Sequence, residues 1–304
     1  MEKTLSKLSG IVLLNKTDGI SSQAAVTRVK RLFGVDKAGH TGTLDPLATG
    51  VLPVLIGRAV KASEFMLTAD KHYTATLLLG VTTDTEDVTG RILTECHALP
   101  TEEEVLRAVL SMKGTSMQTP PMYSAIKVGG AKLYELARRG EVVEREAREI
   151  TVHDISAERI SDAEYTVHVH CSKGTYIRTL LSDIGARLGC GATMKTLMRT
   201  EASGYGIERA HTLDELSAMS EEELEGIVIP TEDVFMKYEA VVLEPFFSRL
   251  ARAGQEIYQR KIGRSLALGT LVRLSDKDGF FALGEVREFG DGTAIKPIRQ
   301  FGKQ

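Results

Sequence analysis

Cysteine is scarce in this 304-residue sequence. Its three cysteines, Cys96, Cys171 and Cys190, are odd in number and show no C-x-x-C spacing. The sequence therefore gives no indication of a disulfide framework or of a zinc site. His168 and His170 precede Cys171 at alternating positions, which is more typical of one face of a strand than of metal ligands. We expect no bound metal ion.

Signals for membrane insertion, secretion and nucleotide binding are also missing. No apolar run approaches the roughly 18 residues that a membrane helix needs. The opening residues, MEKTLSK, lack the apolar core of a signal peptide. The pattern G-x-x-x-x-G-K-[ST], which binds nucleotide phosphates, is absent. We therefore expect a cytoplasmic protein with no membrane partner and no nucleotide-binding P-loop.

The distribution of charge is uneven along the chain. The net charge is −3, but residues 245–304 contain 11 lysines and arginines against 6 acidic residues. Residues 212–233 contain eight acidic residues and no lysine or arginine, and we expect them to form an acidic surface helix. A basic C-terminal module is compatible with a polyanionic partner. The length of the chain predicts two domains.

One polar stretch stands out, and its sequence at residues 39–50 is GHTGTLDPLATG. It shows neither helical nor strand periodicity, so it predicts an ordered loop. The apolar run at 51–56 predicts a buried strand that anchors this loop. Asp45 is the only carboxylate between Asp36 and Glu64. An Asp-Pro pair alone is usually a turn, but if this loop is catalytic, Asp45 is its reactive group.

Helical and strand patterns alternate through the first 240 residues. The predicted strands are 10–15, 51–56, 71–79, 149–160, 164–171 and 192–202, and the predicted helices are 22–33, 58–67, 101–112, 131–139 and about 175–188. Between residues 113 and 139 there are five lysines and arginines and one acid. This excess predicts a basic side on that segment.

Short strands with glycine and aspartate turns fill the C-terminal end. They are predicted at 269–274, 280–286 and 293–298. Closely spaced strands of this kind indicate a small β-barrel.

Two long strings together resemble a known family. The stretch at 39–50 resembles the catalytic loop of the TruB family of tRNA pseudouridine synthases, and CSKGTYIRT at 171–179 resembles that family's second signature. The C-terminal strands resemble a PUA-type RNA-binding barrel. Further matching positions are Asn15, Lys16, Lys71 and Tyr73. Thr17 departs from the pattern, because the family usually has proline there.

The resemblance implies a fold and a domain organisation. We expect an α+β catalytic domain at residues 1–245, with a mixed, mainly antiparallel central sheet and flanking helices. An RNA-binding insertion is expected at about 80–150. A small PUA-like β-barrel is expected at 246–304.

The implied reaction isomerises uridine to pseudouridine without a cofactor. It requires a carboxylate as nucleophile or base, and by resemblance this is Asp45. A buried carboxylate stays ionised when a cation lies near it, and Arg178 is the candidate because its planar guanidinium suits a carboxylate. Tyr73 is expected to stack on the target base and to assist late proton removal. Without the resemblance, Tyr73 would be interpreted as a core tyrosine.

The resemblance also implies substrate-binding residues. His40 is expected to fill the position that the extruded base leaves, and Leu197 and Tyr176 to shape the base pocket. Lys16 and Lys61 are weaker candidates for supporting the site or contacting phosphate. Each of these five residues has an ordinary structural interpretation when taken alone.

The expected substrate is the T-arm of tRNA, at the loop uridine of conventional position 55. The target base must leave its stack to reach the carboxylate, which costs a few kcal/mol. We expect a monomer with no obligatory protein partner. Two alternatives stay open: a guide-RNA-dependent synthase of the dyskerin kind, and a non-catalytic RNA-binding protein on the same fold.

Overall fold

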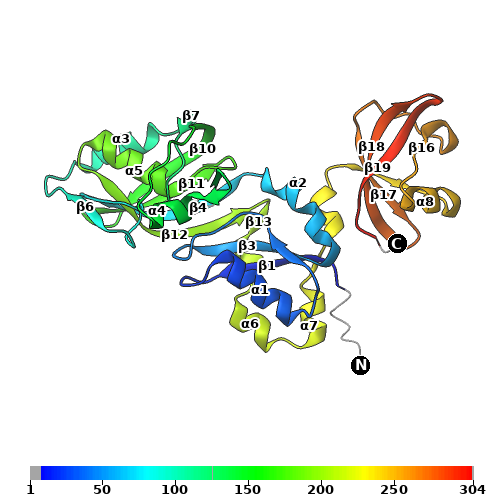
Figure 1. Cartoon of the computed structure of the whole chain (residues 1–304), viewed down its shortest axis with the longest axis horizontal. Helices are drawn as coiled ribbons and strands as arrows, with labels where there is room; N and C mark the ends of the chain where they lie inside the picture. Colours follow the sequence, from blue (N-terminus) through cyan, green and yellow to red (C-terminus); the bar gives the residue numbers. More distant parts are fainter. Residues whose placement is uncertain (1–7, 125, 303–304) are drawn as a thin grey trace.

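The computed structural model describes residues 8–124 and 126–302. Figure 1 shows a larger part built around one long sheet and a smaller part at the C-terminal end, with short helices between them. In the described ranges the larger sheet has ten strands and the smaller sheet has five. This arrangement confirms the predicted α+β class.

The larger sheet is mixed and mainly antiparallel, as predicted. Its main path runs β14-β1-β3-β12-β4-β11-β10-β7, with β2 on β3 and β13 on β12. Strand β12 runs parallel to β3, and the other pairs in this sheet are antiparallel. The strands are β1 (Gly10–Lys16), β2 (Ala38–His40), β3 (Thr49–Ile56), β4 (Lys71–Leu79), β7 (Gly114–Gln118), β10 (Arg148–Arg159), β11 (Glu164–Cys171), β12 (Ala192–Ala202), β13 (Tyr205–Gly206) and β14 (Ile229–Pro230).

Helices pack on the larger sheet, and the burial of side chains along strand β4 shows the face that they cover. Along β4 buried and partly exposed side chains alternate from Lys71 to Leu79, which is the period of a half-buried strand. Buried residues of α1, α3 and α5 join the same apolar core as β4. The helices of this part are α1 (Ser22–Leu32), α3 (Glu102–Leu110), α5 (Ile177–Leu188), α6 (Leu213–Ala218) and α7 (Glu221–Gly226). No helix within 8–124 and 126–302 is long and apolar enough to cross a membrane.

Two segments that were predicted as single helices each form two shorter helices. The segment predicted as a helix at 58–67 is a 3₁₀ helix, η2 (Gly57–Ala62), followed by α2 (Ser63–Leu67). The acidic stretch forms two short helices, α6 and α7, instead of one. Each has its own capping box, Thr212 with Glu215 and Ser220 with Glu223. Ser220 starts the second helix, because the Ser220 and Glu223 side chains accept hydrogen bonds from backbone amides that would otherwise lack partners at that helix start.

The segment expected as an insertion is partly built into the larger sheet. Its edge strand β7 pairs with β10 from Gly114 to Gln118. Besides helix α3, the segment contains β5 (Val81–Thr83), β6 (Ile92–Glu95), β8 (Lys127–Val128), β9 (Ala131–Lys132) and α4 (Leu133–Arg138). The predicted helix at 131–139 is therefore shorter and follows a small hairpin.

The C-terminal module is a curled five-stranded sheet, which is consistent with a PUA-like fold. Its order is β15-β17-β18-β19-β16. The elements are β15 (Glu239–Val242), α8 (Pro245–Arg252), β16 (Ile257–Tyr258), η5 (Gln259–Lys261), β17 (Leu271–Asp276), β18 (Gly279–Phe289) and β19 (Gly292–Gln300). Strand β15 precedes the expected start of this domain at 246, and it pairs with β17. The domain boundary itself stays a prediction.

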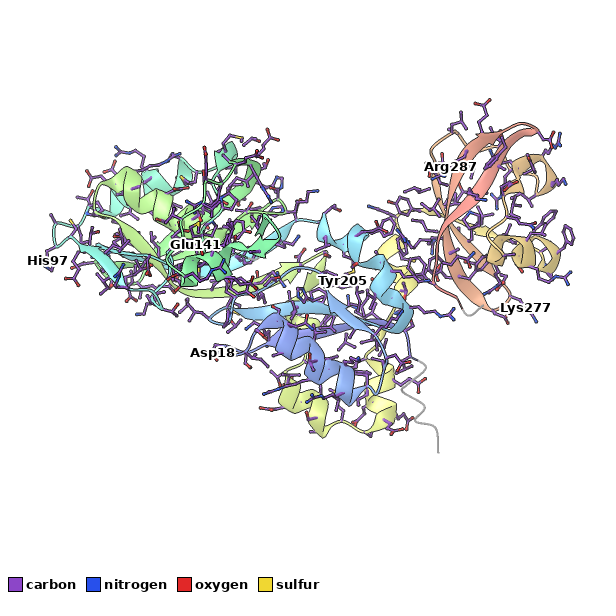
Figure 2. The ribbon with its side chains drawn as sticks, in the orientation of Figure 1. Asp18, His97, Glu141, Tyr205, Lys277 and Arg287 are labelled. Atoms are coloured by element: carbon purple, nitrogen blue, oxygen red, sulfur yellow. The ribbon has the colours of Figure 1, made fainter. Side chains whose placement is uncertain are left out.

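A small aromatic cluster joins the two parts. Phe235, at the end of η4 (Thr231–Phe235), is fully buried. Its ring centroid lies 5.1 Å from that of Phe65 and 5.2 Å from that of Phe301, which belongs to the C-terminal module. Close by, the Tyr205 hydroxyl donates to the Asp233 carboxylate at 2.7 Å. Figure 2 labels Tyr205 near the short helices between the two parts. Apolar burial on both sides of Phe235 therefore holds the module to the larger part.

Candidate active site

A loop between β2 and β3 carries Asp45, and distant segments hold the residues on both sides of it. Ser22 donates through Oγ to the Leu44 carbonyl and accepts from the Leu44 amide, both at 2.8 Å. Lys16, at the end of β1, donates to the Pro46 carbonyl at 3.3 Å. Because both neighbours of Asp45 are fixed, its carboxylate is presented by a rigid loop, as a reactive group requires.

The loop enters β3 through Gly50, which pairs with Arg199 in the parallel contact between β3 and β12. Gly50 has a φ of 100°, and a Cβ added there would lie 2.2 Å from the Arg199 carbonyl oxygen. Residues other than glycine rarely adopt this backbone conformation. Glycine at this position therefore allows the loop to approach β12.

Arg178, in the first turn of α5, forms an ion pair with Asp45. Its Nε lies 2.9 Å from Asp45 Oδ2. The Arg178 side chain is 5% exposed, whereas the Asp45 side chain is 37% exposed. The structure thus brings together the two residues that the sequence analysis paired. The arginine is buried and the carboxylate faces solvent, where a substrate can reach it.

Burial raises the pKa of Asp45 above its ordinary value, and this effect outweighs the opposing Arg178 guanidinium. The negative charge of Asp87 raises the pKa further, while Lys16 lowers it. The expectation that Arg178 favours the ionised form is right in direction. The net shift is nevertheless upward, because the loop and α5 remove much of the solvation of the carboxylate.

Besides Asp45, the polar loop at residues 84–90 and the Tyr123 carbonyl hold the Arg178 guanidinium. Nη1 donates to the Thr85 carbonyl at 2.9 Å, and Nη2 donates to the Tyr123 carbonyl at 2.7 Å. Nη1 also lies 3.8 Å from Oδ2 of Asp87, which is buried. The planar guanidinium is therefore fixed by several groups, and only one of them is Asp45.

Tyr73 lies on β4, opposite Arg199 of β12. Its side chain is buried, and the Arg199 guanidinium lies near enough to affect its pKa. Burial raises the pKa of Tyr73, against the opposing effect of Arg199. The charge of Asp45 contributes to the same upward shift, so Tyr73 lies within electrostatic reach of that carboxylate. A raised pKa favours the neutral phenol.

Three more candidate residues lie on elements that border the loop. His40 ends β2, and its Nδ1 accepts from the Gly42 amide at 3.3 Å. Tyr176 is the N-cap of α5, and burial raises its pKa while Arg178 opposes the shift. Leu197 lies on β12, and its carbonyl accepts from Thr49 at the start of β3 at 3.4 Å. His40 and Leu197 thus border the loop that carries Asp45, and Tyr176 lies two residues before Arg178, the partner of Asp45.

The two candidate lysines, Lys16 and Lys61, donate hydrogen bonds to backbone carbonyls and hold parts of the structure together. Lys16 is fully buried, and besides Pro46 its ammonium donates to the carbonyls of Thr17 at 2.8 Å and Ile20 at 2.9 Å. It supports the loop that carries Asp45 and is not accessible to a phosphate. Lys61 follows the far end of β3 and donates to the Gln300 carbonyl of the C-terminal module at 3.1 Å. The structure does not bring Lys61 to Asp45.

Arg199 is a functional candidate that the sequence analysis missed. Its side chain is 1% exposed, and it donates to the Val51 carbonyl at 2.8 Å and the Gly42 carbonyl at 3.1 Å. It therefore joins both ends of the loop that carries Asp45 to β12, at the position opposite Tyr73. A signal was available, because Arg199 and Leu197 occupy alternating buried positions of one predicted strand. Asp87 was missed because its partner, Arg178, lies far away in sequence.

The fold is shared with a solved protein of known assembly. The chain is similar to one in a crystal structure of a Cbf5–Nop10–Gar1 complex, with a TM-score of 0.72 and 25% sequence identity. The match covers 96% of this chain and 85% of the solved chain. A second match, to a chain of an H/ACA RNP bound to a substrate RNA containing 2′-deoxyuridine, has the same TM-score at 23% identity.

Two models of protein families match consecutive parts of this chain. The model described as TruB family pseudouridylate synthase, N-terminal domain, matches residues 30–177. The model of the tRNA pseudouridylate synthase B C-terminal domain matches residues 178–236. The two matches together span residues 30–236, and with the fold they define the chain as a pseudouridine synthase.

Two curated proteins named tRNA pseudouridine synthase B are similar over nearly their full lengths. The protein from Methylobacillus flagellatus is 40% identical over 297 residues, which cover 97% of each chain. The protein from Clostridium tetani is 39% identical over 284 residues, which cover 93% of this chain and 97% of the relative. The chain belongs to the TruB family of pseudouridine synthases.

Proposed function

We propose that the chain converts the uridine at position 55 in the T loop of tRNA to pseudouridine, in the cytoplasm, as a monomer without a protein partner. The observation that carries this proposal is the ion pair between the accessible Asp45 and the buried Arg178. Membership of the TruB family supports the reaction type. Names of the curated relatives support tRNA as the substrate.

The reaction is an isomerisation, so its atoms balance without a co-reactant. The bond between ribose C1′ and uracil N1 breaks, the uracil turns, and a new bond joins C1′ to C5. The hydrogen that leaves C5 is balanced by a proton gained at N1. Asp45 assists in one of two ways: its carboxylate attacks the nucleotide as a nucleophile, or it removes a proton from the ribose. Both require the ionised carboxylate.

The residues around Asp45 fit a pocket for an extruded base. The ring of Tyr73 would stack on one face of the uracil, and the side chain of Leu197 would pack on the other. Tyr176, at the start of α5, would close the side of the pocket. The raised pKa of Tyr73 keeps its hydroxyl protonated, so little phenolate is present to accept a proton, which favours the stacking role over late proton removal. His40 would fill the vacated position in the RNA.

Exposed basic residues of the C-terminal module would contact RNA further from the reacting base. Arg260 and Lys261 are exposed on η5, beside the Tyr258 ring. Phosphate contacts of this kind contribute affinity and salt dependence but little sequence information. A double variant, Arg260→Ala with Lys261→Ala, should raise KM and reduce the salt dependence of binding, with kcat retained. Unchanged KM and salt dependence would contradict this assignment.

The test of the proposed function uses purified protein alone and a T-arm stem-loop RNA. Chemical mapping of pseudouridine should detect modification at the loop uridine by the wild type. Asp45→Asn should abolish modification while RNA binding is retained. Asp36→Asn, which changes an exposed aspartate outside the catalytic loop, is the matched control and should retain activity.

The two alternatives give different results in this test. A guide-RNA-dependent enzyme would leave the isolated stem-loop unmodified, and a non-catalytic RNA-binding protein would bind it without any modification. Normal turnover by Asp45→Asn would overturn the proposed role of the carboxylate. Modification of a different uridine would overturn the proposed position.

A further inference from the structure

Three histidines and an aspartate gather at one end of the larger sheet, apart from Asp45. His72 on β4 lies directly opposite His170 on β11 in the antiparallel register. The register between β10 and β11 shifts between Val152 and Asp154, so that His153 is the extra residue of a bulge. Bulges re-aim side chains, and here His153 joins His170. The aspartate, Asp70, immediately precedes β4.

The potential ligand atoms lie close together. His153 Nε2 is 3.4 Å from Asp70 Oδ2, and His170 Nε2 is 3.8 Å from the same oxygen. The ligand atoms of these three residues all lie within 4.8 Å of one another. The His72 ring stacks on the His170 ring with centroids 4.0 Å apart and planes inclined by 11°. This stacking holds the imidazole plane of His170 in place.

Contrary to the expectation from the sequence that no metal ion is bound, we propose that Asp70, His153 and His170 form a binding site for a divalent transition-metal ion, and specifically for zinc. Imidazole nitrogens and carboxylate oxygens bind zinc at about 2.0–2.2 Å. Tetrahedral coordination at such bond lengths separates neighbouring ligand atoms by about 3.3–3.6 Å. The two observed separations of 3.4 and 3.8 Å are close to that range. Water would complete the coordination.

A simple hydrogen-bonded triad explains these distances less well. Hydrogen bonds from nitrogen to oxygen are usually 2.7–3.2 Å long, whereas both imidazoles are farther than this from the shared carboxylate oxygen. The side chains of Asp70, His153 and His170 are each between 33% and 48% exposed. An ion can therefore reach the site from solvent.

The ion would act on the stability of the sheet and not on the isomerisation. It would connect β10, β11 and the turn before β4, which are three separate segments of the chain. His72 and His170 are partly exposed, whereas their chain neighbours Tyr73 and Cys171 point to the opposite face and are buried. The metal site thus lies across the sheet from the aromatic ring of the proposed base pocket.

Metal binding can be measured directly on untagged full-length protein that has been stripped with a chelator. Calorimetric titration with Zn²⁺ should show one ion per chain, and Co²⁺ should give the visible absorption of a low-symmetry nitrogen and oxygen site. Zn²⁺ should also raise the melting temperature, because an ion that binds only the folded state stabilises it. His153→Ala and Asp70→Asn should weaken Zn²⁺ binding by more than about 100-fold, since even residues behind the ligands contribute about 10–100-fold.

The matched control is His168→Ala. His168 lies on the same face of β11 as His170, but its Nδ1 pairs with the Thr74 hydroxyl at 3.1 Å and it is outside the cluster. This variant should bind Zn²⁺ like the wild type. Melting of each metal-free variant at the wild-type temperature would show that the fold is intact. Absence of a one-to-one site in the wild type, or equal loss in His168→Ala, would overturn the proposal without affecting the isomerase assignment.

Discussion

Asp45 and Asp87 share a single guanidinium. Arg178 Nε lies 2.9 Å from Asp45, and Arg178 Nη1 lies 3.8 Å from Asp87. The Asp87 side chain is 9% exposed, compared with 37% for Asp45. Asp87 is therefore the interior partner of the arginine, and Asp45 is the partner that can meet substrate. Because the two carboxylates carry like charges, Asp87 raises the pKa of Asp45.

The first prediction concerns Asp87→Asn. Removing this negative charge should lower the pKa of Asp45, so that the acidic limb of the profile of kcat/KM against pH moves to lower pH. Arg178 should also be positioned less well, and kcat should fall by up to about 10²-fold. The control is Asp84→Asn in the same loop, because Asp84 accepts from the Arg91 amide at 2.8 Å. A limb that moves to higher pH would contradict the proposed electrostatics.

The second prediction compares two substitutions of Arg178. Arg178→Lys keeps the charge but loses the planar guanidinium that reaches two carbonyls as well as Asp45, so kcat should fall by about 10²-fold. Arg178→Gln also removes the charge. In that variant the pKa of Asp45 should rise further, and the acidic limb should move to higher pH than in Arg178→Lys. Profiles of kcat/KM against pH for both variants test this difference.

Much of the site could be predicted from the sequence because its signals are local. The catalytic loop combines glycines, an Asp-Pro pair and a following apolar run, and all of these lie within residues 39–56. The strands at 71–79, 164–171 and 192–202 were predicted with the bounds that the structure has. Their periodic burial comes from short-range alternation, which a sequence records directly.

The rest depends on residues that meet only after folding. Ser22 resembles an ordinary residue at the start of a helix, yet its hydroxyl fixes Leu44. Arg199 looks in the sequence like any charged residue of a strand. Its partners are the backbone carbonyls of Val51 and Gly42, and the sequence does not show which carbonyls will lie near it after folding. The cluster of Asp70, His153 and His170 needs three segments and a bulge to form. Spacing along the chain cannot reveal such contacts.

The third prediction concerns Lys16, whose pKa is lowered by burial from 10.5 to about 8. Below about pH 8 the lysine is charged in both folded and unfolded protein, and the full cost of burying the charge is present. Between these two pKa values the unfolded chain binds more protons, so stability should rise with pH. The gain should total about 3 kcal/mol at 1.36 kcal/mol per pKa unit.

The measurement is the difference in unfolding free energy between wild type and Lys16→Met at about pH 7 and about pH 10. Taking this difference removes contributions from other titrating groups. Loss of the hydrogen bonds to three carbonyls should add an offset that does not depend on pH. A difference that stays constant, or one in which the wild type loses stability relative to the variant as pH rises, would contradict the inferred burial of the charge.

The fourth prediction concerns the junction between the catalytic part and the C-terminal module. Phe235 is fully buried between Phe65 and Phe301, so Phe235→Ala should lower the unfolding free energy by about 3–5 kcal/mol. The cavity would lie between the two parts, and limited proteolysis should therefore cut near residues 236–238 faster than in the wild type. Phe246→Ala is the control, because that ring is 57% exposed and should change stability by less than about 0.5 kcal/mol. Equal effects of the two substitutions would show that the aromatic cluster does not hold the module in place.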